Sequence, residues 1–258
     1  MSKPVRARST YVSTLAHNEA IMDPFSAFFS AEVRKLGLVS RARTVPGHNP
    51  AGFVLYEPAD PDRVLATYPG VSTEVHLPDQ VDEADLVLID TYELLTGPLS
   101  RQLHDLISSG RARIGLSLGN ARILTGDIRR RLRGHIDAGR VSMIFGSASE
   151  YRMLYPDLPP DLATPSGFLR HPIRHRVPFC LLTDGTNGMA AHHGPDYAAA
   201  PAAQVEAHEV INTSGAGDTA AGVFVVGVLS HVELANLLRQ CAEQASRVVS
   251  IPGSRIVG

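Results

Sequence analysis

Short, continuous runs of apolar residues recur through the second half of the chain and are separated by stretches with helical spacing. The runs cover residues 86–89, 114–118, 141–145 and 179–183, and helical patterns lie near 99–109, 123–136, 149–154 and 233–250. Continuous apolar strands that alternate with helices are typical of parallel sheets. The pattern predicts an α/β fold, with a parallel sheet covered by helices on both faces.

The first part of the chain has a different pattern. Asp23-Pro24 is typical of a helix start, and the helix should run to about residue 36. Its apolar positions have helical spacing, and we expect them to lie in the core: Phe25, Phe28, Phe29, Val33 and Leu36. Residues 51–56 and 64–68 read as the two strands of a hairpin with a turn at 60–62.

A glycine-rich turn at residues 212–218 (Asn-Thr-Ser-Gly-Ala-Gly-Asp) lies between an apolar pair at 210–211, read as a strand end, and a small-residue helix at 219–229. The first N–H groups of a helix lack intrahelical partners, and glycine lets a ligand approach them. The turn therefore predicts an anion site, where Asp218 could accept the proton of an attacking hydroxyl. The alternative is an ordinary helix start, where Asp218 only complements the helix dipole.

Composition narrows the functional classes. The 258 residues are 44% hydrophobic and carry a net charge of −2, so a basic surface for nucleic acid is not expected. We find neither an apolar run long enough to span a bilayer nor a signal-peptide pattern. Cys180 and Cys241 lie in apolar segments and are expected to be buried free thiols, which favours a cytoplasmic location. Lys3 and Lys35 do not follow a glycine-rich loop, which excludes a P-loop.

Residues 212–218, continued by Thr219 and by Ala221-Gly222, resemble the Asp-Thr-x-Gly-Ala-Gly-Asp signature of the ribokinase-like (PfkB) family of sugar and nucleoside kinases. The resemblance implies one ribokinase-like domain over residues 1–258, with residues 48–72 contributing to a small β lid that also forms a homodimer. It implies ATP and Mg²⁺ as cofactors. It also assigns Asp218 as the catalytic base, and an anion hole formed by Gly215, Ala216 and Gly217. Asn212 replaces an Asp linked to a monovalent-cation site, so a requirement for that cation stays open.

Two further segments carry the resemblance. Glu150 matches the Glu of an Asn-x-x-Glu motif and would hold Mg²⁺, while Ser147 replaces the Asn; alternatively, Glu150 only completes a capping box with Ser147. The segment from 182 to 189 reads as a hairpin and resembles a Thr-x-Gly-x-x-Gly turn beside the nucleotide. The implied ATP contacts are Thr183, Gly185, Gly188, Thr213 and, beside the adenine, Gly253.

Other polar segments fit simpler interpretations. Residues 170–176 contain two histidines and three arginines and read as a solvated basic loop, because cationic neighbours oppose metal binding. His192-His193 is expected to lie in an exposed turn, and residues 197–203 in a mobile surface segment.

The functional hypothesis is transfer of the ATP γ-phosphoryl group to a hydroxyl of a sugar or nucleoside-like small molecule. The family's opening strand, with its substrate-binding Asp and Gly-Gly-Asn-type segment, would lie upstream of Met1. The alternative is therefore a non-catalytic pseudokinase, or a dimer that binds a nucleotide or metabolite.

Overall fold

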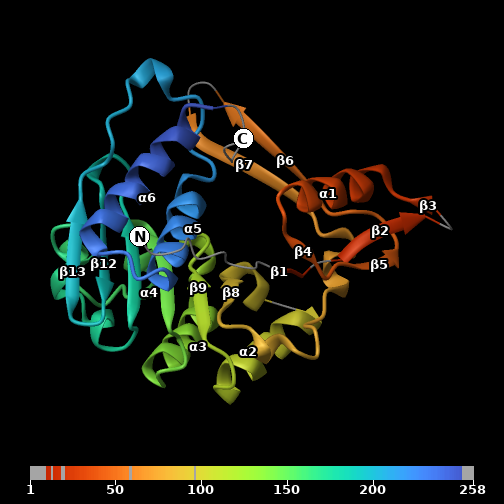
Figure 1. Cartoon of the computed structure of the whole chain (residues 1–258), viewed down its shortest axis with the longest axis horizontal. Coiled ribbons are helices and arrows are strands. Elements are labelled where there is room, and N and C mark those ends of the chain that lie inside the picture. The colour runs from red at the N-terminus through yellow and green to blue at the C-terminus, as the bar shows by residue number, and fades with distance from the viewer. Residues whose placement is uncertain (1–9, 13, 19–20, 58–59, 96, 252–258) are drawn as a thin grey trace. The chain divides into compact units, whose positions relative to one another are not determined.

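The computed structural model describes residues 10–12, 14–18, 21–57, 60–95 and 97–251 (Figure 1). The chain divides into two compact units. Unit 1 comprises Met1–Val5, Asp82–Leu95 and Leu106–Gly258, and unit 2 comprises Arg6–Val81 and Thr96–Asp105. All candidate site residues that were predicted from the sequence and that the structure describes belong to unit 1.

Unit 1 is built on a six-stranded sheet with the order β13-β12-β11-β10-β9-β8. The strands from β8 to β11 are parallel, and β12 and β13 add to them in antiparallel hairpins. The bounds are β8 (Val87–Asp90), β9 (Ile114–Ser117), β10 (Met143–Ser147), β11 (Phe179–Thr183), β12 (Met189–His193) and β13 (Asp196–Ala200). The predicted α/β class and its mostly parallel sheet are confirmed.

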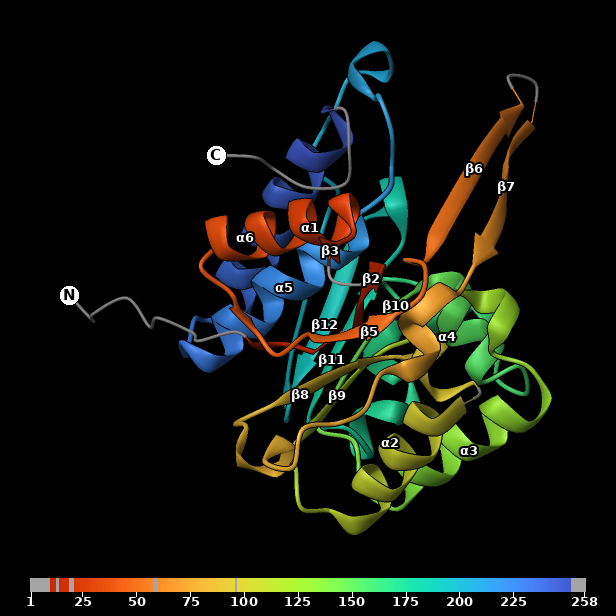
Figure 2. The same cartoon turned by 90° about the vertical axis from the view of Figure 1, so that its right-hand side faces the viewer.

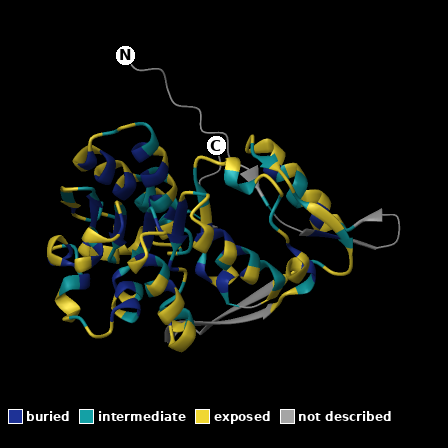
Figure 3. Ribbon diagram, turned by 90° about the horizontal axis from the view of Figure 1, so that it is seen from below, coloured by how far each residue is buried: buried dark blue, intermediate teal, exposed yellow. Residues whose placement is uncertain are grey.

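The helices of unit 1 are α3 (Gly126–Asp137), α4 (Ala148–Leu154), α5 (Ala216–Leu229) and α6 (Leu234–Val249), close to the predicted ranges. Short 3-10 helices complete the unit: η3 (Thr91–Leu94), η4 (Ala121–Ile123), η5 (Pro160–Ala163), η6 (Phe168–Arg170), η7 (Pro172–His175), η8 (Gly185–Asn187) and η9 (Ala207–Glu209). Figure 2 shows α5 and α6 lying against the strands, and Figure 3 shows the buried residues gathered inside the unit.

Both faces of the central strands are covered. Side chains alternate between the faces of a strand, and one face packs against α5 and α6 through Met143, Phe145, Leu181, Met189 and Ala191. Phe145 meets Phe224 of α5 edge to face, with ring centroids 6.2 Å apart. On the other face, the buried ring of Tyr151 from α4 lies over β10 and β11 and donates a hydrogen bond to the carbonyl of Leu181. Cys180 and Cys241 are buried free thiols, as predicted.

Among its described residues, unit 2 contains small sheets, one α-helix that lies wholly within it and a 3-10 helix. The order β3-β2-β5 forms one sheet, β1 pairs with β4, and β6 and β7 form an antiparallel hairpin. The bounds are β1 (Thr10–Tyr11), β2 (Thr14–Asn18), β3 (Ile21–Met22), α1 (Pro24–Lys35), β4 (Val39–Ser40), β5 (Arg43–Pro46), β6 (Ala51–Glu57), β7 (Asp60–Tyr68) and η1 (Gly70–Glu74). Two helices, η2 (Val81–Glu83) and α2 (Gly97–Ser109), each contain residues of both units. The predicted hairpin is present, but residues 60–62, which were expected to form its turn, belong to β7.

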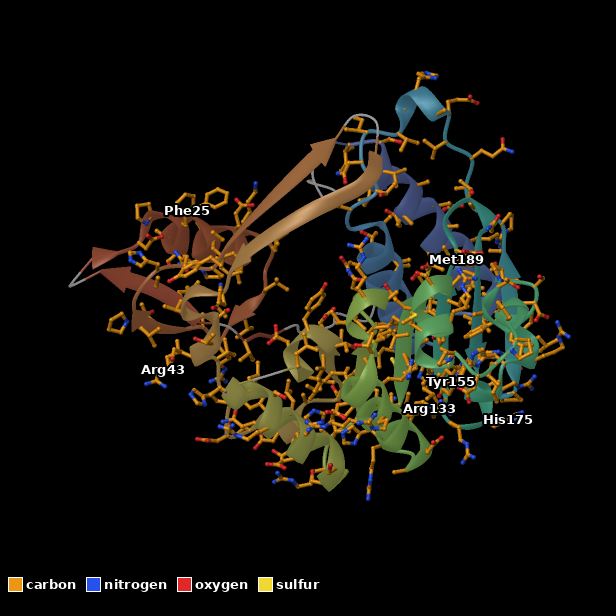
Figure 4. The ribbon with its side chains drawn as sticks, turned by 180° about the vertical axis from the view of Figure 1, so that it is seen from behind. Phe25, Arg43, Arg133, Tyr155, His175 and Met189 are labelled. Carbon is orange, nitrogen blue, oxygen red and sulfur yellow. The ribbon has the colours of Figure 1, made fainter. Side chains whose placement is uncertain are left out.

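The start of α1 follows the sequence prediction, but its apolar face does not. The Asp23 carboxylate accepts hydrogen bonds from the N–H groups of Phe25 and Ser26, at 2.9 and 3.3 Å. Phe25, labelled in Figure 4, Phe28 and Leu36 were expected in the core but are 77%, 67% and 51% exposed. Val33 is buried as predicted, and the helix also buries Ser26, whose hydroxyl donates to the Ala16 carbonyl at 2.9 Å.

Other local predictions are also wrong. His171 was expected in a solvated basic loop at 170–176 but is buried. Residues 210–211 form no strand: Val210 and Ile211 are 42% and 56% exposed, and the Ile211 N–H donates to the carbonyl of Val249 at the end of α6. The expected mobile segment at 197–203 instead contributes most of β13, which pairs with β12 along its whole length. His192 is expected to be exposed but is buried, because it lies within β12 and not in a turn. None of the helices in the described part of the chain has the length and apolar character needed to cross a bilayer.

Candidate active site

The glycine turn leads directly into α5. Gly215 is the N-cap residue and has φ +82°, a left-handed conformation that glycine adopts without a steric penalty. Before it, the side-chain oxygen of Asn212 accepts a hydrogen bond from the Ser214 N–H at 2.6 Å, and the Thr213 carbonyl accepts one from the Ala216 N–H at 3.5 Å. Within the described residues, no side chain caps α5. Its first N–H groups are therefore suited to an anionic ligand.

Asp218 lies in the first turn of α5 and is exposed, as is Gly217. Nothing lies within 4 Å of the position that a Cβ on Gly217 would occupy. The turn is thus open to solvent, and the carboxylate of Asp218 is accessible to a ligand there. The roles of base for Asp218 and of anion hole for Gly215, Ala216 and Gly217 stay predictions.

Glu150 lies in the first turn of α4, at the carboxyl end of β10. Its Oε2 accepts a hydrogen bond from the Ser147 N–H at 2.7 Å, and the Ser147 hydroxyl oxygen accepts one from the Glu150 N–H at 3.3 Å. This is the capping box that the sequence offered as an alternative. The bonds occupy one carboxylate oxygen, so the cap is compatible with a ligand on Oε1.

Electrostatic interactions connect Glu150 with other carboxylates. Burial raises the pKa of Glu150, its hydrogen bonds with Ser147 lower it, and the negative charges of Asp90 and Asp218 raise it further. The structure therefore brings Glu150 and Asp218, which the sequence predicted separately, within electrostatic range of each other. A bound cation would relieve the repulsion among these groups.

Asp90 and Glu93 were missed by the sequence analysis. Asp90 ends β8, and its Oδ1 accepts a hydrogen bond from the Tyr92 N–H at 2.9 Å. A Cβ on Gly119, which has φ +69°, would lie 2.8 Å from that Oδ1 atom. Burial and the nearby charge of Asp90 raise the pKa of Glu93. A polar residue directly after an apolar strand was the available signal, since ligands in such sheets gather at the carboxyl ends of the strands.

Polar residues lie in register at these carboxyl ends. Asp90 pairs with Ser117 of β9, and Ser147 pairs with Thr183 of β11. Thr183 is thus beside the residue that caps α4, on the strand next to Glu150. This placement is compatible with the predicted nucleotide contact of Thr183 but does not test it.

The turn after Thr183 is a tight connection between β11 and β12. The Asp184 N–H donates to the Gly188 carbonyl at 2.8 Å, and the Asn187 N–H donates to the Asp184 carbonyl at 2.9 Å. Gly185 and Gly188 have φ of +52° and +95°, so any other residue at either position would strain the backbone. A Cβ on Gly188 would lie 2.3 Å from the Ala200 carbonyl oxygen, whereas Gly185 has open space around it.

The remaining predicted residues are less informative. Thr213 is exposed and lies two residues before the α5 N-cap. Gly253 lies outside the described residues. Over the described chain, no group of three or more His, Cys, Asp or Glu side chains is arranged to hold a metal ion. A metal here would take most of its ligands from water and phosphate, as Mg²⁺ commonly does.

The architecture is similar to that of several solved kinases. An adenosine kinase from Sinorhizobium meliloti superposes with a TM-score of 0.81 and 19% identity, covering 97% of this chain and 75% of the other. For an adenosine kinase from Schistosoma mansoni, in complex with 2-fluoroadenosine, the TM-score is 0.78 and the identity 17%, and the match covers 96% of this chain and 75% of the other. For a putative ribokinase II from E. coli, in complex with ATP and Mg²⁺, the TM-score is 0.76 and the identity 15%, and the match covers 96% of this chain and 78% of the other.

The sequence itself matches the model of the pfkB family of carbohydrate kinases over residues 22–257. That range includes the glycine turn, Asp218 and Glu150. No curated protein matches the sequence significantly. The fold is that of the ribokinase-like kinases. The chain belongs to the pfkB carbohydrate kinase family.

Proposed function

We propose that the protein is an ATP-dependent kinase that transfers the γ-phosphoryl group to a hydroxyl of a sugar or nucleoside-like small molecule. The observation that carries the proposal is the start of α5, where an uncapped helix N-terminus stands next to an accessible carboxylate, that of Asp218. The family match and the kinase neighbours give no support to the non-catalytic alternative.

In this proposal, Asp218 takes the proton of the acceptor hydroxyl as the hydroxyl oxygen attacks phosphorus. The N–H groups at Gly215, Ala216 and Gly217 stabilise the negative charge that develops on the transferring group. Because these donors are backbone groups fixed by the helix, they need little reorganisation during the reaction. ADP leaves, and the proton stays on Asp218 until solvent removes it.

ATP and Mg²⁺ are the cofactors of the proposal. Carboxylate oxygen is a ligand that Mg²⁺ prefers, and Glu150 has one such atom outside its capping bonds. Bound Mg²⁺ would neutralise phosphate charge. Thr183, Gly185, Gly188 and Thr213 are the proposed nucleotide contacts, with Gly253 beside the adenine.

A nucleoside is the first acceptor to test, because the neighbours include adenosine kinases and one of them holds 2-fluoroadenosine. A sugar comes next, in view of a probable sugar kinase from Rhizobium etli, with a TM-score of 0.75 and 20% identity over 96% of this chain and 73% of that one.

The test is ATP-dependent phosphorylation of a nucleoside and sugar panel by the whole chain, followed by ADP release and by ³¹P NMR of the product. Asp218→Asn should lower kcat by about a hundredfold to ten-thousandfold, as expected for loss of a general base, while calorimetry shows unchanged ATP binding. Asp127→Asn, an exposed aspartate of α3 paired with Arg130, is the control and should keep full activity. Wild-type turnover in Asp218→Asn, or a wild-type chain that does not bind ATP in the presence of Mg²⁺, would contradict the proposal.

The homodimer and the cytoplasmic location belong to the same proposal. Among the strands that the structure describes, β6 and β7 pair only with each other, so the outer edges of this hairpin could pair with a second copy. A dimer mass by light scattering, lost on deletion of the hairpin tip, would support the β-lid interface, and a monomer mass at micromolar concentration would contradict it. We propose a cytoplasmic location because the cytoplasm supplies the ATP that the reaction needs.

A further inference from the structure

Two histidines that the proposed reaction does not use lie buried in unit 1. His171 precedes η7 and is 1% exposed, and His192 of β12 is 0% exposed. The ring of Phe168 lies between them, with its centroid 5.5 Å from His171 and 5.1 Å from His192. The chain thus places two titratable rings in one aromatic cluster away from solvent.

The hydrogen bond of His171 requires the neutral ring, and that of His192 fixes which nitrogen carries the proton of the neutral ring. His171 Nδ1 accepts a hydrogen bond from the Ile173 N–H at 3.2 Å, so that nitrogen carries no proton. His192 Nε2 lies 2.8 Å from the Phe168 carbonyl oxygen, which can only accept, so Nε2 carries the proton of the neutral ring. In the part of the chain that the structure describes, His192 Nδ1 is a buried atom without a hydrogen-bond partner.

A second proton is unfavourable on either ring. On His171 it would point at the N–H of Ile173, and on either ring it would place a positive charge away from solvent, which costs free energy. The titratable groups around His171 are Tyr151 and Tyr155, from α4 and its C-cap, and His192. Around His192 they are His171, Tyr197 of β13, and Arg174 and His175 of η7; hydrogen bonding to the backbone of Phe168 and Asp196 partly offsets the effect of burial on the pKa of His192.

The cluster holds the connection between α4 and β11, residues 155–177, against the sheet. Tyr151 packs edge to face on Phe168 and His171, with centroid distances of 5.0 and 5.8 Å. Tyr155 contacts His171 at 5.2 Å, and its ring carries the guanidinium of Arg133 at 5.0 Å. Figure 4 shows Arg133 and Tyr155 together, with His175 in the same part of the unit.

We propose that His171 and His192 make the α4–β11 connection acid-sensitive. The connection stays closed while both rings are neutral and opens locally when either ring takes up a proton. This behaviour is independent of the proposed kinase activity, although α4 also carries Glu150.

The direction of the pH effect follows from the two states. Burial, with a further contribution from His192, lowers the pKa of His171 from 6.5 to about 4 in the closed form, and burial also lowers the pKa of His192. The opened form has the ordinary value of about 6.5. The closed form is therefore fully favoured above pH 6.5 and loses stability as the pH falls from 6.5 towards 4. For His171 alone, local opening at pH 5.5 should exceed that at pH 7.5 by about tenfold.

Hydrogen exchange followed by mass spectrometry on the whole chain tests the proposal at pH 7.5 and pH 5.5, after correction for intrinsic exchange rates. Peptides from residues 155–177 should lose protection by about tenfold at pH 5.5 in the wild type, whereas peptides from α6 keep theirs. In the double variant His171→Asn/His192→Gln, the amide oxygen replaces the Nδ1 acceptor and the amide nitrogen replaces the Nε2 donor. Its protection should not change with pH. His208→Gln, an exposed histidine, should behave as wild type.

An equal loss of protection in the double variant, or no pH effect in the wild type, would overturn the proposal. If the double variant does not fold, ¹⁵N NMR of the wild-type histidine rings decides. Two rings that remain neutral Nε2–H tautomers down to pH 5.5 support the proposal, and a midpoint near 6.5 for either buried ring refutes it.

Discussion

Ser147 and Glu150 exchange two hydrogen bonds, backbone N–H to carboxylate at 2.7 Å and backbone N–H to hydroxyl at 3.3 Å. The carboxylate that we propose as a magnesium ligand is therefore also part of the N-terminal cap of α4. The two roles can be separated, because glutamine completes a capping box as glutamate does but carries no charge.

Glu150→Gln should keep stability within about 0.5 kcal/mol and raise the Mg²⁺ concentration for half-maximal activity by at least about tenfold. Glu150→Ala should additionally lower the free energy of unfolding by about 1 kcal/mol, through loss of the cap. Urea denaturation and Mg²⁺ titration of ATP turnover measure the two effects.

Glu233 offers a matched control, since its carboxylate caps α6 by accepting from the Ala235 and Asn236 N–H groups at 2.9 and 3.0 Å. Glu233→Gln should leave the Mg²⁺ dependence unchanged. An equal rise in the Mg²⁺ requirement in both variants would show that Glu150 acts only as a cap.

The two glycines of the β11–β12 turn should differ sharply in their response to alanine. Both have positive φ, but a Cβ on Gly188 would lie 2.3 Å from a backbone oxygen, whereas one on Gly185 meets open space. Gly185→Ala should cost about 1 kcal/mol, as a left-handed alanine does, and Gly188→Ala should cost about 3 kcal/mol or more, because backbone must move. Urea denaturation measures both costs.

If Gly185 also contacts ATP, as we propose, its alanine variant should raise the KM for ATP while the structure stays folded. Equal destabilisation by the two substitutions would show that the turn relaxes around the added methyl group. An unchanged KM in Gly185→Ala would remove Gly185 from the nucleotide site.

The sequence was sufficient for the four parallel strands of the central sheet, because they are continuous apolar runs and are covered on both faces. It was insufficient for polar residues that a sheet buries. His192 follows Ala190 and Ala191, whose small side chains give little strand signal, and its burial depends on pairing with Cys180 of β11. His171 lies among arginines, and only the rings of Tyr151 and Phe168 explain why it is buried.

The candidate site was predictable to the extent that its motifs are local. Asn212 to Asp218 and Ser147 to Glu150 act within a few residues, so spacing alone indicates helix starts. Asp90 was missed because nothing in its own segment separates a strand-end ligand from a turn former, and the Asp90 side chain does form a turn, with the Tyr92 N–H. Its interaction with Glu150 depends on the order of the strands in the sheet.

The buried thiols provide a probe of global unfolding. Cys180 and Cys241 are both 0% exposed, and burial raises the pKa of Cys241 to about 12 and that of Cys180 further. Since the thiolate is the reactive form, neither should react with a disulfide reagent at pH 8 until the protein unfolds. Under native conditions unfolding should limit the labelling, so the labelling rate should not depend on the reagent concentration. In urea, both thiols should react at once. Rapid labelling of a native thiol would contradict the burial.

Asp90→Asn tests whether the residue that the sequence analysis missed takes part in the proposed reaction. Asparagine can keep the turn, because its side-chain oxygen accepts from the Tyr92 N–H as the carboxylate does, so stability should change by less than about 0.5 kcal/mol. Loss of the charge near Glu150 and Asp218 should lower kcat/KM by about tenfold or more if Asp90 acts on the bound ligand or metal. Steady-state kinetics of the variant measure this effect, with Asp127→Asn as the control for removal of an acidic charge elsewhere in unit 1. Unchanged kinetics in Asp90→Asn would restrict Asp90 to forming the turn after β8.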